Sequence, residues 1–448
     1  MKKGMFFALA ASSLLFSACS SDDAVVSTEG QNEAVQQIVL QVASSGDGLS
    51  TRAGRPLYSS EALQTIQHVR VLIYNSATKA IVKDEQLDWT KSDTYDNHGR
   101  KLTLTYKGDQ RLSGGNYKVM AVGYSDKSDY TYSLGVTGTA ALTGTYSDIT
   151  ATLNTGKVAE EVFAGDAALT INDNKQITTL TPGEENRLAV TLHRQVAGSF
   201  GYFQNIPAKV GGKTAKTLRL VVRDKNDMLT FKDFNSSFTA TGATGSTIKY
   251  CVNGSKSAAA PASDAQFKGG EKGYVLYSID LDTWFTEGDK NNDGLLNADD
   301  TWVHPSSVKT QVVKGSVFGS NFVIPFALTS GKSTMELQLL DTDGKIIKTW
   351  TVSIPLADLN HDTSNGNVAD ENVSIFNVVR NHMYNLGVKP SNGGKTDPDP
   401  GNPNPDPKPD PNPDKPDPDK PEDLNKSQNL ILKVNDNWEA IHNMELGE

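Results

Sequence analysis

One loop of this 448-residue sequence has the residue types and spacing of a calcium site. Residues 289–300 match the twelve-residue EF-hand pattern, with Gly294 at the sixth position, where the chain must turn sharply. Oxygen ligands at alternating positions suit Ca²⁺, a hard cation. The alternative is an Asp/Asn/Gly loop that binds no ion. The expected ligands are the side chains of Asp289, Asn291, Asp293, Asn297 and Asp300 and the backbone carbonyl of Leu295.

Catalytic motifs are absent from the sequence. It contains no G-x-S-x-G elbow, no H-E-x-x-H pair and no phosphate-binding glycine loop, and its seven histidines are scattered. Trp284 and Trp302 flank the Asp-rich loop and would either stack on a sugar or pack in the core. We therefore expect a protein that is not an enzyme and has no organic cofactor.

The first 19 residues predict a secretion signal. Two lysines precede an apolar run that is too short to span a membrane. Small residues stand directly before Cys19, as in a bacterial lipobox, so Cys19 is expected to become the acylated N-terminus; ordinary signal cleavage near Ala18 is the alternative. Residues 20–23, Ser-Ser-Asp-Asp, resemble the acidic signal of lipoproteins at the outer face of the outer membrane. We expect a precursor anchored to the outer membrane by lipid and exposed at the cell surface.

Charge and cysteine content argue against nucleic-acid binding and against a disulfide. The net charge of −10 disfavours nucleic acid as a partner. The sequence has two cysteines, and if Cys19 carries lipid, then Cys251 has no partner for a disulfide. Cys251 is expected to be a small buried residue, with a free reactive thiol as the alternative.

Residues 35–56 combine a strand with a protease-sensitive loop. Ile38, Leu40 and Val42 alternate with other residues at the strand period of two. The following Gly-rich loop is of the kind that proteases cut, and because Arg55 precedes a proline, Arg52–Ala53 is the expected cleavage point. A plain surface loop is the alternative. Cleavage would release the strand and expose an apolar groove with unpaired backbone groups.

The C-terminal tail is apolar and follows a linker of alternating prolines and aspartates, residues 397–421. Such a linker is extended at ~3.1 Å per residue, so about 25 residues span roughly 70–80 Å, more than the width of a small domain. This reach favours delivery of the tail as a strand to the open sheet edge of another molecule. The alternatives are a strand or helix that folds back onto its own domain and a disordered tail. The expected donor-strand residues are Leu430, Ile431, Leu432, Val434 and Trp438.

The body of the chain reads as all-β. Short runs of β-branched and aromatic residues alternate with Gly, Asn, Asp and Ser turns, and helical periodicity is scarce. Strands at such short spacing are typical of a β-sandwich. Residues 337–340 and 346–352, joined through Asp343-Gly344, predict a hairpin.

Together these features resemble the fimbrillins of Bacteroidetes, the subunits of type V pili. The resemblance rests on the lipobox at Cys19 and on four segments, which are Thr-Arg-Ala-Gly at 51–54, Val-Arg-Val-Leu-Ile-Tyr at 69–74, Leu-His-Arg-Gln-Val-Ala at 192–197 and Arg-Asn-His-Met-Tyr-Asn-Leu at 380–386. It implies two tandem transthyretin-like β-sandwich domains, a lipoprotein precursor trimmed after an arginine by an arginine-specific protease, and a C-terminal donor strand that fills the groove of the next copy. The Pro/Asp-rich linker departs from this pattern, since we expect the family's donor strand to follow the second domain more directly.

The resemblance gives a domain organisation and a function. The chain is expected to be a structural stalk subunit of a cell-surface fimbria, which polymerises by protease-triggered donor-strand exchange and supports adhesion. The role of an accessory fimbrial subunit is left open as an alternative. The alternative is a monomeric surface lipoprotein that binds glycan or host matrix. The expected parts are the signal peptide 1–19, a propeptide with a removable strand 20–52, the N-terminal sandwich 53–187, the C-terminal sandwich 188–389, the linker 390–427 and the donor strand 428–448.

Overall fold

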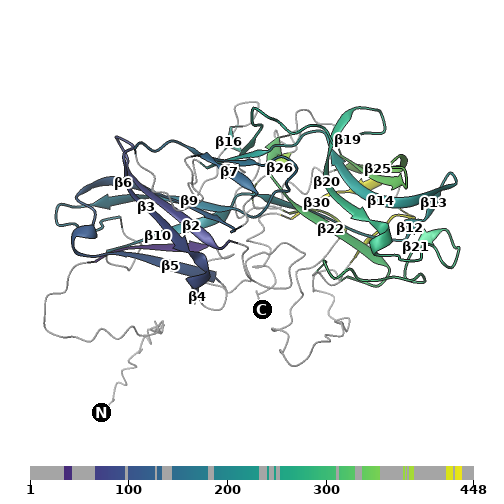
Figure 1. Ribbon diagram of the computed structural model, residues 1–448, viewed down its shortest axis with the longest axis horizontal. Helices are drawn as coiled ribbons and strands as arrows, with labels where there is room; N and C mark the ends of the chain where they lie inside the picture. Colours follow the sequence, from purple (N-terminus) through teal and green to yellow (C-terminus); the bar gives the residue numbers. More distant parts are fainter. Residues whose placement is uncertain are drawn as a thin grey trace, which may run out of the picture.

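The runs of alternating and β-branched residues form strands, as their pattern predicts. In the computed structural model the described part of the chain contains strands, turns and short 3₁₀ segments, and no α-helix. Within that part no helix is long and apolar enough to cross a membrane. The prediction of an all-β protein is confirmed, and the strands gather into two lobes along the long axis of the molecule (Figure 1). The described residues are 35–42, 66–95, 99–126, 129–133, 144–179, 186–231, 240–241, 247–248, 253–308, 312–327, 335–353, 377–378, 380, 383–387, 420–426 and 429–435.

The first lobe is built on an eight-stranded sheet with the order β3-β2-β6-β9-β10-β1-β5-β4. Residues 187–192 of β10 pair with β1, and His193 and Arg194 pair with β9, so the sheet folds over at β10. The apolar faces of its two halves enclose one core, which includes Val71, Val119 and Leu192. The strands are β1 (Gln36–Val42), β2 (His68–Asn75), β3 (Ile81–Asp88), β4 (Asp93–Tyr95), β5 (Gly99–Tyr106), β6 (Gly115–Tyr124), β9 (Phe163–Ile171) and β10 (Arg187–Arg194).

A glycine makes the fold at β10 possible. A Cβ atom at Gly165 of β9 would lie 1.9 Å from the backbone oxygen of Thr191 on β10. No side chain fits in that space, so glycine allows the two backbones to approach where the sheet folds over.

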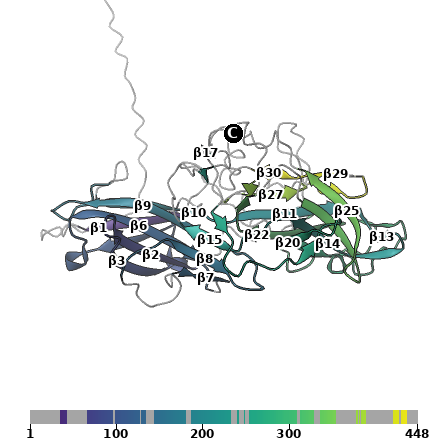
Figure 2. The ribbon, with the colours of Figure 1, turned by 90° about the horizontal axis from the view of Figure 1, so that it is seen from above.

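A third layer joins the two lobes. Its order is β18-β15-β8-β7, and β8 pairs with β15, which lies far beyond it in the sequence (Figure 2). Tyr132 of this layer shares a core with Leu72 and Met120 on the second face of the first lobe's sheet. The strands are β7 (Tyr130–Tyr132), β8 (Ile149–Leu153), β15 (Met228–Phe231) and β18 (Gly254–Ser255).

The second lobe is a sandwich of two sheets around the same large core. One sheet has the order β22-β11-β27-β30, with β28 also paired to β11; the other has the order β19-β20-β14-β24-β25-β29, with β13 also paired to β14. The predicted hairpin is β24–β25, with Gly344 at a φ of +75° in its turn. These strands are β11 (Ala197–Gln204), β13 (Lys209–Val210), β14 (Lys213–Val222), β19 (Ala265–Gln266), β20 (Lys272–Asp280), β22 (Ser316–Val323), β24 (Met335–Asp341), β25 (Ile346–Ser353), β27 (Met383–Leu386), β28 (Glu422–Asp423), β29 (Asn429–Ile431) and β30 (Lys433–Asn435).

The division between the lobes differs from the expected boundary at residues 187 and 188. That boundary falls at the start of β10, which is a strand of the first sheet, and the chain enters the second lobe between Arg194 and Ala197. The shared third layer also contains β15 and β18 from the second half of the sequence. The remaining short strands pair in twos and are β12 (Ile206–Pro207) with β21 (Leu295–Leu296), β16 (Ala240–Thr241) with β17 (Thr247–Ile248), and β23 (Phe326–Ala327) with β26 (Asn377–Val378).

Candidate functional site

The strand expected at residues 35–42 is β1, an internal strand of the first lobe. It pairs in parallel with β10 along one edge and antiparallel with β5 along the other. Ile38 and Leu40 point into the core and are 1% and 0% exposed. Removing β1 would therefore open a gap in the middle of a sheet.

A buried glutamine fixes one end of β1. Gln36 is 1% exposed, and its Nε2 donates to the backbone oxygens of Leu112 and Lys175, both at 2.9 Å. Its Oε1 accepts from the backbone N–H of Leu112 at 2.8 Å. Sequence analysis missed this residue, although Gln36 shares the inward period-two positions of Ile38 and Leu40. Among the described residues, Gln36 is the one whose side chain bonds to both the backbone N–H and the backbone C=O of Leu112.

The covalent link from β1 to the next described strand is a single segment, residues 43–65, which contains Arg52 and Ala53. Both residues, and Cys19, lie outside the described residues. One cut in this segment would leave β1 held by hydrogen bonds and apolar contacts alone.

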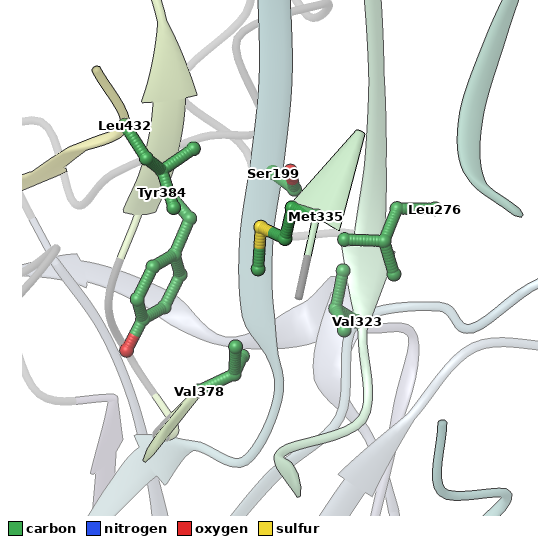
Figure 3. Close-up of a pocket in the computed structure, with 7 residues that line it drawn as sticks. All are labelled: Ser199, Leu276, Val323, Met335, Val378, Tyr384 and Leu432. Atoms are coloured by element: carbon green, nitrogen blue, oxygen red, sulfur yellow. The ribbon is translucent and has the colours of Figure 1, made fainter. Parts of the chain in front are cut away.

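The C-terminal tail packs on the chain's own second lobe. β29 pairs in parallel with β25, and β30 pairs antiparallel with β27, so the tail bonds to both sheets of the sandwich. Leu430 and Leu432 are 1% and 0% exposed. In Figure 3, Leu432 lies beside Tyr384 in the apolar interior between the sheets. The single chain thus adopts the arrangement in which the tail folds back onto its own domain; Ile431 and Val434 lie on β29 and β30, and Trp438 lies outside the described residues.

The segments that flank residues 388–421, which contain the Pro/Asp-rich linker, meet on β11. Leu386 of β27 is opposite Gly201, and Glu422 of β28 is opposite Phe203, in the same parallel direction. A Cβ atom at Gly387 would lie 3.2 Å from the backbone oxygen of Lys420. The linker therefore leaves and returns at one place, and its reach is not needed to connect β27 with the tail.

The Asp-rich loop is folded by hydrogen bonds to its carboxylates. Gly294 has a φ of +88° and donates its N–H to Asp289 Oδ2 at 3.1 Å. Asp300, which is buried, accepts from the N–H groups of Lys290 at 2.9 Å and Asn297 at 3.0 Å. The loop thus turns at the predicted glycine, and two carboxylates at its ends hold the turn.

Within this loop Asp293 is a further acceptor. It accepts from Leu295 N–H at 2.8 Å, from Asn297 Nδ2 at 2.8 Å and from Asn291 Nδ2 at 3.1 Å. The bond from the Leu295 backbone, followed by that from Asn297, lowers the pKa of the Asp293 carboxyl. The carboxylate is therefore held in its charged form.

The predicted calcium ligands share this loop, but their oxygens are occupied mainly by N–H donors. Oδ1 of Asp289 is buried and has no hydrogen-bond partner among the described atoms. In the whole described part of the chain, no group of three or more His, Cys, Asp or Glu side chains is arranged to hold a metal ion. Calcium binding stays a prediction.

The two tryptophans beside the loop pack against each other rather than form an open platform. Trp284 is 2% exposed, and its ring centroid lies 6.1 Å from that of Trp302. Trp302 is partly buried and donates Nε1–H to the backbone oxygen of Ser316 at 2.7 Å. Trp284 is thus a core residue and has no face available for stacking on a sugar.

Comparison with known proteins finds similarity at the level of structure alone. No protein family and no curated protein sequence matches the chain. The solved structures to which it is similar include adhesin candidates and fimbrial proteins of Bacteroidetes, and a candidate polysaccharide-binding protein from Bacteroides thetaiotaomicron. An adhesin candidate from Bacteroides ovatus has 10% identity and a TM-score of 0.38, and the alignment covers 79% of this chain and 90% of that one.

Two further structures are fimbrial proteins. A fimbrial assembly protein from Parabacteroides distasonis has 14% identity and a TM-score of 0.32 over 80% of this chain and 92% of that one. The fimbrial anchor protein Mfa2 from Porphyromonas gingivalis has 9% identity and a TM-score of 0.32 over 79% of this chain and 91% of that one.

Proposed function

We propose that this protein is a structural subunit of a cell-surface fimbria, which polymerises by protease-triggered donor-strand exchange. The observation that carries the proposal is the position of β1, an internal strand whose link to the rest of the fold is one segment containing Arg52. A cut after Arg52 turns β1 into a separate, non-covalently held strand.

Loss of β1 leaves an open groove in which binding of a replacement strand is strongly favoured. The facing edges of β10 and β5 lose their ladder partners, and unpaired edges of this kind are templates for strand addition. The pockets of Ile38 and Leu40 also become exposed, and burial of each such side chain is worth roughly 1.5–3 kcal/mol. An apolar strand from another copy would pair with both edges and fill both pockets.

The remaining parts of the precursor fit this role. Lipid on Cys19 would hold the unprocessed chain at the outer membrane, and an arginine-specific protease would release the trimmed subunit for assembly with other copies. A chain that carries both Arg52 and an apolar tail suits a stalk subunit, because it can accept a strand and donate one. The glycan-binding alternative is weakened, since Trp284 is buried in the core.

The test compares cleavage and assembly in the purified, signal-free chain. Limited treatment with a trypsin-like protease, followed by N-terminal sequencing, gel analysis and electron microscopy, should show a new N-terminus at Ala53 together with ladders or fibres. An Arg52→Gln chain and a chain that ends at Lys389 should both stay monomeric. A fully trimmed chain that stays monomeric would refute the proposal.

We also propose that the loop at residues 289–300 binds calcium weakly, with a dissociation constant on the order of 0.1–1 mM, as extracellular sites do. The support is the twelve-residue spacing, the turn at Gly294 and the unpartnered Oδ1 of Asp289. Calcium should then produce heat in a calorimetric titration and raise the thermal unfolding midpoint, and Asp289→Ala should abolish both effects. Absence of heat and of any shift in the unmodified chain would remove this proposal.

A further inference from the structure

The tail repeats the sequence pattern of β1 position by position. Residues 428–434 read Gln-Asn-Leu-Ile-Leu-Lys-Val, and residues 36–42 read Gln-Gln-Ile-Val-Leu-Gln-Val. We propose that the tail of one copy enters the vacated groove of another in this register, with Leu430 in the place of Ile38 and Leu432 in the place of Leu40. The inference rests on the proposed function and adds the register and the residue that determines it.

The apolar positions support the alignment. Ile38 lies between Leu188 of β10 and Leu104 of β5 in the ladder. Exchanging isoleucine for leucine conserves volume and is tolerated in cores, and Leu40 is matched by leucine. A slip by one residue would turn every apolar side chain to the wrong face.

A slip by two residues keeps the apolar side chains facing the core, so the alternation of side chains does not exclude it. The buried backbone groups at the polar end of the groove do exclude it. When β1 leaves, the buried N–H and C=O of Leu112 and the C=O of Lys175 lose the Gln36 amide. A two-residue slip would bring Leu430 to these groups, and an unsatisfied buried polar group is costly. The proposed register brings Gln428, whose amide has both the donors and the acceptor required.

We therefore infer that Gln428, which lies outside the described residues, is the specificity-determining residue of the donor strand. In the proposed alignment Gln428 is identical to Gln36, the described residue whose side chain bonds to both the backbone N–H and the backbone C=O of Leu112.

The same tail gains more from the groove than from its own lobe. On its own lobe β29 pairs along one edge with β25, and β30 pairs along one edge with β27. In the groove the whole strand would pair along two edges, as β1 does. Since Leu430 and Leu432 are already buried on the lobe, the apolar burial is similar in both places and the additional ladder favours transfer.

One position departs from the match. Lys433 takes the place of Gln41, which is opposite Lys101 on β5. Like charges directly opposite one another destabilise a strand pair. Lys433→Gln should therefore assemble more readily than the unmodified chain, with the largest difference at low salt.

The register can be read by disulfide mapping in the full signal-free chain with Cys251→Ser. In the proposed register residue 433 lies opposite residue 101, whereas after the two-residue slip it lies opposite Thr103. After cleavage at Arg52, the pair Lys433→Cys with Lys101→Cys should give reducible intermolecular bonds, and the pair Lys433→Cys with Thr103→Cys should not. Cross-strand partners of this kind are close enough to be bridged.

The second readout is the rate at which oligomers form, which appear as a ladder of bands on a gel. Gln428→Ala should slow it by about tenfold or more, as expected for buried groups left unsatisfied, whereas Gln428→Asn should show a smaller defect. Preferential bonding of residue 433 to residue 103, or an unchanged rate for Gln428→Ala, would overturn the register while strand exchange stands. If the unmodified trimmed chain forms no ladder, strand exchange and its register both fall.

Discussion

The meeting of the linker ends on β11 predicts that most of the linker can be removed without loss of the tail's position. Leu386 is opposite Gly201 and Glu422 is opposite Phe203, so one residue fits between them in a continuous strand. Deletion of residues 388–421 leaves Gly387 as that residue. Gly387 has a φ of +79° and must become extended in the joined strand, which glycine does readily.

The magnitude follows from chain entropy. Closing a loop of about 34 residues costs about 3 kcal/mol on the (3/2)RT ln n relation. The deletion should therefore raise the free energy of unfolding of the tail by up to about 3 kcal/mol. Urea unfolding and hydrogen exchange of the β29 and β30 amides would measure the change.

A matched control changes the register alone. Deletion of residues 388–422 joins Gly387 to Asp423 and shifts the following residues by one position, which turns Leu424, 0% exposed in the structure, away from the core. We expect this chain to lose protection of the tail amides. Equal behaviour of the two deletions, or loss of the tail in both, would refute the idea that β28 continues β27.

Three further predictions concern buried groups. Leu432→Ala should weaken tail packing by roughly 2–5 kcal/mol, as for other buried leucines, and proteolysis should release the tail faster; unchanged proteolysis would contradict the burial of Leu432. Glu161→Gln removes the carboxylate that faces Arg194, with both side chains 1% exposed, and should cost about 3–5 kcal/mol in chemical unfolding; a cost below about 1 kcal/mol would contradict the pairing. Burial, followed by the charge of Asp166, raises the pKa of Tyr74 to about 12. An unfolded tyrosine ionises near pH 10, so the contribution of un-ionised Tyr74 to the stability of the fold is complete below pH 10 and is lost as the pH rises toward 12. In that pH window the thermal unfolding midpoint of Tyr74→Phe should depend less on pH than that of the unmodified chain.

Local sequence patterns were informative wherever the cause of the structure is local. The period of two identified β1 and the inward positions of Ile38 and Leu40, and Leu430 and Leu432, which were expected in a strand of the tail, are buried. The turn at Gly294 followed from the spacing of the Asp-rich loop. Each of these features depends on residues within a few positions of one another.

Other features depend on contacts between distant segments. The pairing of β8 with β15 and the return of the linker to Lys420 leave no pattern in the neighbouring residues. Gln36 was missed because its partners are the backbones of Leu112 and Lys175, which have no recognisable side-chain signal. The occupied oxygens of the Asp-rich loop were likewise visible only in three dimensions.

Side-chain alternation and turn residues act over a few positions, so local sequence is enough to predict which segments become strands and which faces they bury. Which sheet edges those strands occupy depends on contacts between distant segments. Ladder hydrogen bonds join backbone groups that all residues except proline share, so an open edge accepts strands of many sequences. β1 and the tail have the same pattern, yet one lies inside the first lobe and the other on the second, because packing and chain connection select among equivalent edges.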